Sequence, residues 1–152
     1  MSYIENIKPL ETSSTTFAYI YGVVCGDGHV RTNKSKGRTR GEIILKVNDE
    51  DFMLNFKIML ERWSGRKAKQ GRKGKFFYSC LYSIRHAEVV KDYRIEEVLN
   101  LPIECKYLFL RGLFDSDGGI VGKNLENRRK SKRWLHFSNS NAAIIYIVRK
   151  LF

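Results

Sequence analysis

The sequence contains an internal repeat, and this repeat constrains the fold more than any other feature. A glycine, an aspartate and a second glycine recur at one constant offset, as Gly22, Asp27 and Gly28 and again as Gly112, Asp117 and Gly118. A second set recurs at an offset that is one residue longer, as Asn48, Phe56 and Leu60 and again as Asn139, Ile147 and Leu151. Both copies therefore predict the same unit: helix, Asp-Gly, basic segment, strand, asparagine cap and helix.

Small residues lie four positions apart in both copies: Gly22 and Gly26 in the first, Gly112 and Ser116 in the second. Residues i and i+4 share one face of a helix, so each predicted helix presents a face without bulky side chains. Two such faces allow close helix packing. We expect these four residues to form the contact between two helices related by a pseudo-twofold axis. The alternative is that each glycine only tolerates crowding by a core side chain.

This helix pair would bring Asp27 and Asp117 together where both helices end. The last carbonyl groups and the negative ends of both helix dipoles would surround the two carboxylates. Hard oxygen ligands suit Mg²⁺, and Mn²⁺ or Ca²⁺ as substitutes. Bound metal ions can activate water and stabilise the leaving oxygen in phosphodiester hydrolysis. A single Asp-Gly is typical of a turn, but two equivalent copies favour a metal site.

The chain is strongly basic, with a formal net charge of +12 and a pI near 9.8, which favours a polyanionic partner. Of its 28 Lys and Arg residues, 18 fall in residues 29–46, 66–75 and 123–133. Most of these are expected to contact DNA from strands and loops beside the acids: Arg31, Lys34, Lys36, Arg38, Arg40, Lys46, Lys67, Lys69, Arg72, Lys73, Lys75, Arg128, Arg129, Lys130, Lys132 and Arg133. Solvated loops, or a packing protein of the ribosomal type, stay open as alternatives.

Other features exclude several classes of protein. The three cysteines and three histidines are scattered, so neither a disulfide framework nor a zinc motif can be drawn. No segment has the length and apolarity of a membrane span, and the first residues lack the apolar stretch of a signal peptide. We expect one compact, cytoplasmic domain that acts as a monomer without a membrane or a required protein partner.

The local pattern predicts the order of the elements. Capping residues, apolar periodicity and glycine-rich breaks indicate the elements of the first copy: a helix within 17–25, a basic loop at 34–41, a strand at 42–47 and a helix at 49–63. A basic hairpin and strand over 65–84 and a helix at 86–100 follow. The second copy is expected to contain a helix after Pro102, a basic loop at 123–133, a strand at 134–138 and a last helix at 142–152. In the helix at 49–63, Phe52, Leu54, Ile58 and Met59 are the expected buried stripe. Asn48-Asp49 and Asn139-Ser140-Asn141 are the expected caps.

The two motif copies, IYGVVCGDG and LRGLFDSDG, align without gaps to LAGLIDADG, and the second is the closer copy. The chain resembles the single-chain, two-motif LAGLIDADG homing endonucleases, especially the archaeal intron-encoded kind that serves intron homing. The resemblance implies an α+β fold of two pseudo-twofold-related αββαββα repeats. Residues 1–103 form the first repeat with its lead-in, and 104–152 form a second, incomplete repeat within the same compact domain.

The resemblance also implies an activity. Strands would straddle the major groove of double-stranded DNA at a long, partly asymmetric target, and both strands would be cut to leave short 3′ overhangs. Asp27 and Asp117 would bind the catalytic divalent ions, with the carbonyl groups of Gly26 and Ser116 as further ligands. Lys46 best matches the basic strand-end residue near the scissile phosphate, Lys123 matches less closely, and Ser83 is a weaker candidate.

Two other functions would use the same basic fold: RNA splicing by a maturase, and DNA binding without cleavage. Retention of both acids favours the nuclease, because binding alone does not require them. A PD-(D/E)xK nuclease could be argued from Glu104-Cys105-Lys106, but this triplet follows Pro102 at a predicted helix start, where a glutamate is favourable for electrostatic reasons alone.

Overall fold

Two helices at the centre of the molecule, α1 (Thr15–Cys25) and α4 (Ile103–Asp117), contact each other more extensively than any other pair of elements. The computed structural model describes residues 10–122 and 133–152. Ser14 caps the N-terminus of α1, because its hydroxyl accepts a 3.1 Å hydrogen bond from the Phe17 amide. Pro102 precedes α4 with a φ of −54°, which suits entry into a helix.

Glycine is required where these two helices touch. A Cβ atom added to Gly22 would overlap the Phe109 carbonyl oxygen, and one added to Gly112 would overlap the Tyr19 carbonyl oxygen. A Cβ at Gly26 would overlap the Cβ of Ser116. The four small residues singled out from the sequence therefore lie in the contact itself, and the two backbones approach without intervening side chains.

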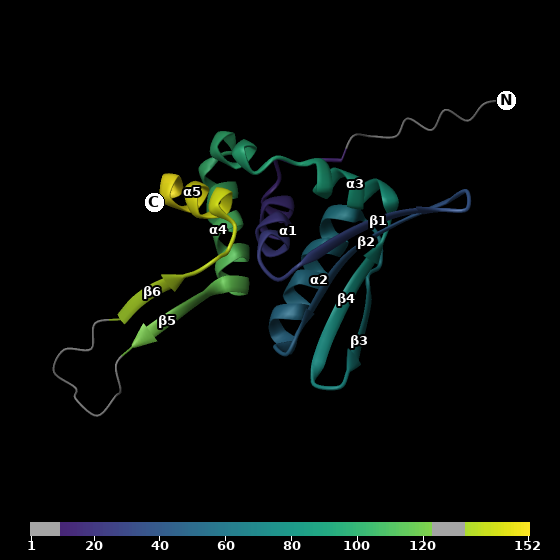
Figure 1. Cartoon of the computed structure of the whole chain (residues 1–152), viewed down its shortest axis with the longest axis horizontal. Coiled ribbons are helices and arrows are strands. Elements are labelled where there is room, and N and C mark those ends of the chain that lie inside the picture. The colour runs from purple at the N-terminus through teal and green to yellow at the C-terminus, as the bar shows by residue number, and fades with distance from the viewer. Residues whose placement is uncertain (1–9, 123–132) are drawn as a thin grey trace.

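The first repeat forms a four-stranded antiparallel sheet in the order β1-β2-β4-β3, built from β1 (His29–Ser35), β2 (Arg38–Val47), β3 (Lys69–Lys73) and β4 (Phe76–Tyr82). α2 (Glu50–Ser64) and α3 (Ile84–Asp92) pack against one face of this sheet (Figure 1). Ile43, Leu45 and Leu81 point into the core from that face and are buried. Because side chains alternate along a strand, the other face is left to solvent.

The second repeat is shorter. The 3₁₀ helix η1 (Ile95–Asn100) leads into α4, which is followed by the antiparallel pair β5 (Gly118–Gly122) and β6 (Arg133–Phe137) and by α5 (Ala142–Leu151). This pair lies on the opposite side of α1 and α4 from the four-stranded sheet (Figure 1). The predicted α+β fold is confirmed, and the described part of the second repeat contains one strand pair and the helices on either side of it.

Three local predictions are wrong in whole or in part, each because a longer-range or backbone effect decides the structure. Residues 34–41 are not a loop: β1 and β2 continue through them and join at Lys36-Gly37, where φ is 45° and 76°. Positive φ at both central residues is the geometry of the tightest hairpin turns, which keeps the strands paired to their ends. The basic residues of this segment are therefore held on strands.

The buried stripe of α2 agrees with the prediction only in part. The predicted Phe52 and Met59 are partly buried against the core, but the fully buried residues are Met53, Phe56 and Leu60, and the predicted Ile58 is 46% exposed. Apolar residues occur on several sides of this helix, so periodicity alone could not choose the face that meets the sheet. Its cap is Asp49, whose carboxylate accepts a 3.0 Å hydrogen bond from the Phe52 amide.

The predicted helix at 86–100 is interrupted at Tyr93. α3 ends at Asp92, and the chain is extended at Tyr93 and Arg94 before η1. The Tyr93 ring packs edge-on against Phe17 and Tyr21, and the Tyr21 hydroxyl donates a 3.2 Å hydrogen bond to the Tyr93 carbonyl. These contacts with α1 stabilise an extended residue where local propensity favours a helix. Among residues 10–122 and 133–152, no helix has the length and apolarity needed to cross a membrane.

We predict that Gly22→Ala destabilises the protein by about 1–3 kcal/mol or more, because the added methyl group meets backbone atoms that cannot rotate away. Gly119→Ala is the matched control, since a Cβ there meets nothing within 4 Å. Denaturant unfolding of both variants measures the difference. Stabilisation of the Gly22→Ala variant by about 1 kcal/mol, the gain expected from helix propensity alone, would contradict the close backbone contact.

Candidate functional site

The two repeated aspartates lie at the same end of the central helix pair. Asp27 is exposed in the turn that follows α1, and Asp117 is the last residue of α4 and is half-buried. The amides of Gly26 and Gly28 both donate to the Val23 carbonyl, at 3.0 and 2.9 Å, which fixes the turn that carries Asp27. A Cβ built on Gly26 would lie 3.3 Å from Asp117 Oδ2, so the second carboxylate reaches the backbone beside the first.

The two carboxylates influence each other electrostatically. Burial, followed by the charge of Asp117, raises the pKa of Asp27. Burial raises the pKa of the neighbouring Cys25 thiol to about 12, and the Asp117 charge adds to this effect. Within the part of the chain that the structure describes, neither aspartate forms an ion pair with a basic side chain. The negative charge at this end of the helices is therefore not compensated by those residues.

Asn139 is a site residue that the sequence analysis assigned to another role. Its Nδ2 donates a 2.6 Å hydrogen bond to Asp117 Oδ2 and also lies 3.5 Å from the Cys25 carbonyl oxygen. It thus connects the ends of α4 and α1. The cap of α5 is instead Asn141, whose Oδ1 accepts a 2.9 Å hydrogen bond from the Ala143 amide. In the sequence, Asn139 is marked only by its equivalence to Asn48 in the repeat, and that position predicts a helix cap rather than a contact with Asp117.

Ser116 contributes to the helix contact through its side chain. Its hydroxyl donates to the carbonyl groups of Gly112, at 3.1 Å, and Val23, at 3.4 Å. Any metal ligand from Ser116 would therefore be its backbone carbonyl, and the ligand roles of Ser116 and Gly26 stay predictions.

The donor set suits a hard divalent cation that keeps much of its hydration. Among the described residues there is no cluster of three or more His, Cys, Asp and Glu side chains able to hold a metal ion. Two carboxylates with nearby carbonyl groups are too few for a closed protein cage, but Mg²⁺ is commonly bound by one or two carboxylates together with waters and substrate phosphates. The residues therefore fit a site that an oxyanionic substrate would complete.

The solvent face of the four-stranded sheet is basic. Cross-strand pairs point to the same face, and the register places Arg31 opposite Glu42, Asn33 opposite Arg40, and Ser35 opposite Arg38. β2 and β3 continue this face with Lys46, Lys69 and Lys73, which pair with Tyr78, Cys80 and Phe76 of β4. The structure thus brings six of the expected DNA-binding residues onto one surface: Arg31, Arg38, Arg40, Lys46, Lys69 and Lys73.

The other basic residues of this repeat lie elsewhere. Lys34 and Arg72 alternate to the opposite face of the sheet, where the Arg72 guanidinium lies 5.2 Å from the centre of the Phe77 ring. Lys36 and Lys75 occupy turns, and Lys67 precedes β3. In the second repeat, Lys123, Arg128, Arg129, Lys130 and Lys132 lie outside the described residues, and Arg133 is the first residue of β6.

Lys46 lies at the end of the sheet that is nearest to the acids. His29 of β1 pairs with Ile44 of β2. Asp27 lies two positions before His29 and Lys46 lies two positions after Ile44, so both residues lie toward the same end of this antiparallel pair. The Lys46 ammonium group lies 5.1 Å from the centre of the Phe76 ring. Ser83, the weaker candidate, has a different role, because its buried hydroxyl caps α3 and lies 2.7 Å from His86 Nδ1.

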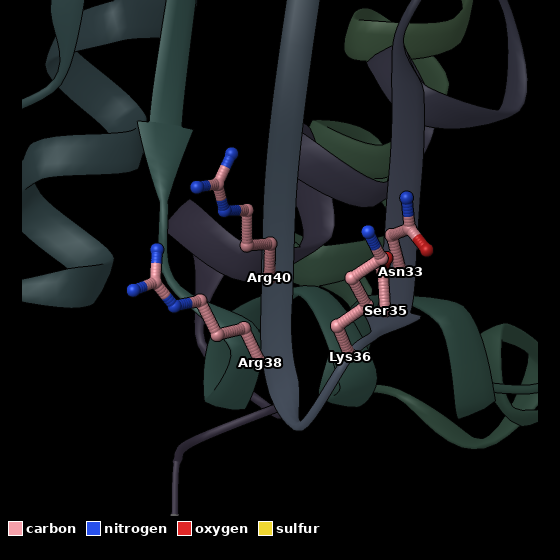
Figure 2. Close-up of a pocket in the computed structure, with 5 residues that line it drawn as sticks. All are labelled: Asn33, Ser35, Lys36, Arg38 and Arg40. Atoms are coloured by element: carbon pink, nitrogen blue, oxygen red, sulfur yellow. The ribbon is translucent and has the colours of Figure 1, made fainter.

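The far end of the β1–β2 hairpin has a hollow of about 500 Å³, lined by Asn33, Ser35, Lys36, Arg38 and Arg40. Figure 2 shows the guanidinium groups of Arg38 and Arg40 extending to the same side of β2. Lys36, Arg38 and Arg40 form no ion pair with any residue in the described ranges. Exposed, uncompensated cations around a hollow are suited to bind phosphate groups.

Comparisons with known proteins agree with this architecture. Residues 104–152 match the model of the LAGLIDADG-like domain family. A structure from a study of mesophilic variants of the homing endonuclease I-DmoI is 18% identical, covers 93% of this chain and 76% of its own, and has a TM-score of 0.72. I-DmoI in complex with DNA and Ca is 22% identical, covers 93% and 72%, and has a TM-score of 0.68. Comparison with curated protein sequences gives no match.

A variant of I-DmoI in complex with its target DNA in the presence of Mg is 17% identical, covers 92% of this chain and 76% of its own, and has a TM-score of 0.68. At these identities the likeness establishes a shared fold. The chain therefore has the LAGLIDADG homing endonuclease fold, and the match to the family model is confined to residues 104–152.

We predict that Asp27→Asn raises the melting temperature of the metal-free protein at neutral pH. A carboxyl group whose pKa is raised by folding stabilises the protein below its ordinary pKa, and that contribution is lost as pH rises through the raised value. The gain from Asp27→Asn should therefore be absent in strong acid and grow toward neutral pH. Thermal unfolding in EDTA across this range measures it.

The same thermal unfolding experiments test whether the charge of Asp117 contributes to the gain in melting temperature. If it does, the double variant Asp27→Asn/Asp117→Asn gains less in stability than the two single variants added together, because either substitution removes the same repulsion. A lower melting temperature for Asp27→Asn at neutral pH would show that the acids do not repel each other in the folded protein.

Proposed function

We propose that this protein is a metal-dependent DNA endonuclease of the LAGLIDADG homing type, which hydrolyses both strands of a specific duplex. The observation that carries the proposal is the meeting of Asp27 and Asp117 at one end of the helix pair, beside a basic sheet face. The fold is that of I-DmoI, whose structures contain DNA with Ca or with Mg. A maturase or a non-cleaving binding protein would use the basic sheet without needing two adjacent, uncompensated acids.

Mg²⁺ is the proposed cofactor, and Mn²⁺ or Ca²⁺ would bind at the same residues. Asp27 and Asp117 hold it, with the carbonyl groups of Gly26 and Ser116 as further ligands. When bound, the ion supplies an activated water and stabilises the charge on the leaving oxygen. Asn139 donates a 2.6 Å hydrogen bond to Oδ2 of Asp117, the oxygen that lies beside Gly26, and so holds this carboxylate in a fixed orientation.

The basic residues position the substrate. Arg38 and Arg40 on the solvent face of the sheet neutralise phosphates of the duplex, and Lys46 lies at the strand end that is nearest to the acids. Lys123 would serve the second half of the site. We propose that the target is a long, partly asymmetric duplex, because the two repeats carry different residues at equivalent positions. We propose that the protein acts as a cytoplasmic monomer and leaves short 3′ overhangs.

We predict that Asp27→Asn and Asp117→Asn each reduce Mg²⁺-dependent cleavage by about 1,000-fold or more, since the loss of a metal ligand removes several kcal/mol of transition-state stabilisation. DNA affinity should change only a few-fold. The assay uses a plasmid that carries the insertion-free junction of the host gene, and Asp51→Asn on the exposed start of α2 is the matched control. Normal cutting by both variants would rule out the assigned chemistry.

We further predict that Asn139→Ala raises the Mg²⁺ concentration for half-maximal cleavage by about 10- to 100-fold, as is usual when a residue that orients a metal ligand is removed. Asn141→Ala is the control from the same loop: it removes the cap of α5 and costs about 1 kcal/mol of stability, but it should leave the metal dependence unchanged. Equal metal dependence of the two variants would show that Asn139 has only a structural role.

A further inference from the structure

Glu42 is an acidic residue in a surface that is otherwise built to bind an anion. In strands β1 to β4, all of which the structure describes, it is the only Asp or Glu. The register places it on the solvent face, between Arg31 of β1 and Tyr82 of β4. A carboxylate at this position repels the phosphates of any duplex laid on the sheet, so it weakens binding that depends on charge alone.

The ion pair with Arg31 does not account for this residue. Glu42 Oε1 lies 3.5 Å from a terminal nitrogen of Arg31, and the Arg31 side chain is 65% exposed. The Glu42 side chain is 25% exposed, but its partner is mostly in solvent, so solvent screens the pair and it contributes little to folding stability. This weak ion pair is a poor reason to keep an acid on a basic surface, which favours a role for Glu42 in binding.

The surroundings of Glu42 have the shape that base recognition requires. β4 ends at Tyr82, the partner of Glu42, so only β1 and β2 continue beyond this point. A two-stranded ribbon of this kind fits the major groove of B-form DNA. Where β4 ends, Glu42, Tyr82 and Arg40 help to line a hollow of about 390 Å³, and the Tyr82 side chain is 57% exposed. The carboxylate therefore lies where the sheet narrows to a two-stranded ribbon.

A carboxylate selects one base by its hydrogen-bonding pattern. In the major groove cytosine offers an N4 amino donor, whereas guanine and thymine present acceptors that repel a carboxylate. Adenine pairs its N6 donor with an adjacent N7 acceptor, so it suits an amide better than a carboxylate. Arg31, directly across the strand pair, has the donors that suit guanine.

We propose that Glu42 is a specificity-determining residue that accepts a hydrogen bond from the N4 amino group of a cytosine in the major groove of the target. This inference rests on the proposed function, because it needs duplex DNA on the sheet. Arg31 is positioned to bind the guanine of the same or the neighbouring base pair. Glu42 thus lowers the affinity for DNA of any sequence and adds a preference for one base at one position of the target.

The test is selection of duplexes from a randomised double-stranded DNA library by the full chain in Ca²⁺, followed by sequencing. The wild type should require cytosine at one position of the selected sequence. Glu42→Ala should reduce that preference by about 5- to 150-fold, the range for one good base contact, while preferences at other positions persist. Its affinity for duplexes of unrelated sequence should rise slightly, because a repulsive charge has been removed.

Two further variants keep the test decisive. Glu88→Gln, on the exposed side of α3, removes one negative charge away from the sheet face and should leave every base preference unchanged. If Glu42→Ala does not fold, Glu42→Gln carries the test, and its preference should move from cytosine toward adenine, which a side-chain amide suits. A uniform change in affinity with unchanged base preferences in the Glu42 variant would overturn the proposal.

The outcomes also separate this inference from the proposed function. If the wild type selects and cuts specific duplexes but Glu42 variants keep its preferences, only the role of Glu42 is wrong. If the wild type neither binds duplex DNA nor cuts it with Mg²⁺, the proposed function is wrong and the role of Glu42 falls with it.

Discussion

The rest of the structure depends on the close contact between the backbones of α1 and α4. Gly22 and Gly112 each lie against a carbonyl oxygen of the opposite helix, so the spacing of the two helices is set by main-chain atoms. Large side chains at these positions would push the helix ends apart. Because Asp27 and Asp117 follow directly from those ends, the same contact sets the distance between the two carboxylates. The backbone contact that packs the core therefore also determines the geometry of the site.

This constraint has an electrostatic cost. Like charges are held near each other beside the negative ends of two helices, and partial burial together with the charge of Asp117 raises the pKa of Asp27. Asn139 satisfies one oxygen of Asp117 without neutralising it. Sites that hold uncompensated charge in this way are commonly functional, because a bound ion or substrate supplies what the protein lacks.

The pairing register of the strands separates two surfaces of the first repeat. On one face of the sheet, Ile43, Leu45 and Leu81 pack under α2 and α3. On the other, Arg31, Arg40 and Lys46 form a basic surface with Glu42 among them. A shift of one residue in register would exchange the two faces, so the apolar core also fixes which charges face solvent. The described part of the second repeat offers a smaller, two-stranded counterpart.

The repeat, the expected pairing of two helices and the two acids could all be predicted from the sequence, because each is visible as residue types at a fixed spacing. The basic character of residues 29–46 could be predicted in the same way. Three features came only from the folded protein: the strands on both sides of the Lys36-Gly37 turn, the burial of Met53, Phe56 and Leu60 in α2, and the end of α3 before Tyr93. The tertiary structure likewise revealed Asn139 beside Asp117 and Glu42 on the basic face. These features depend on contacts between segments far apart in the chain, and local periodicity carries no information about which distant residue will be the partner.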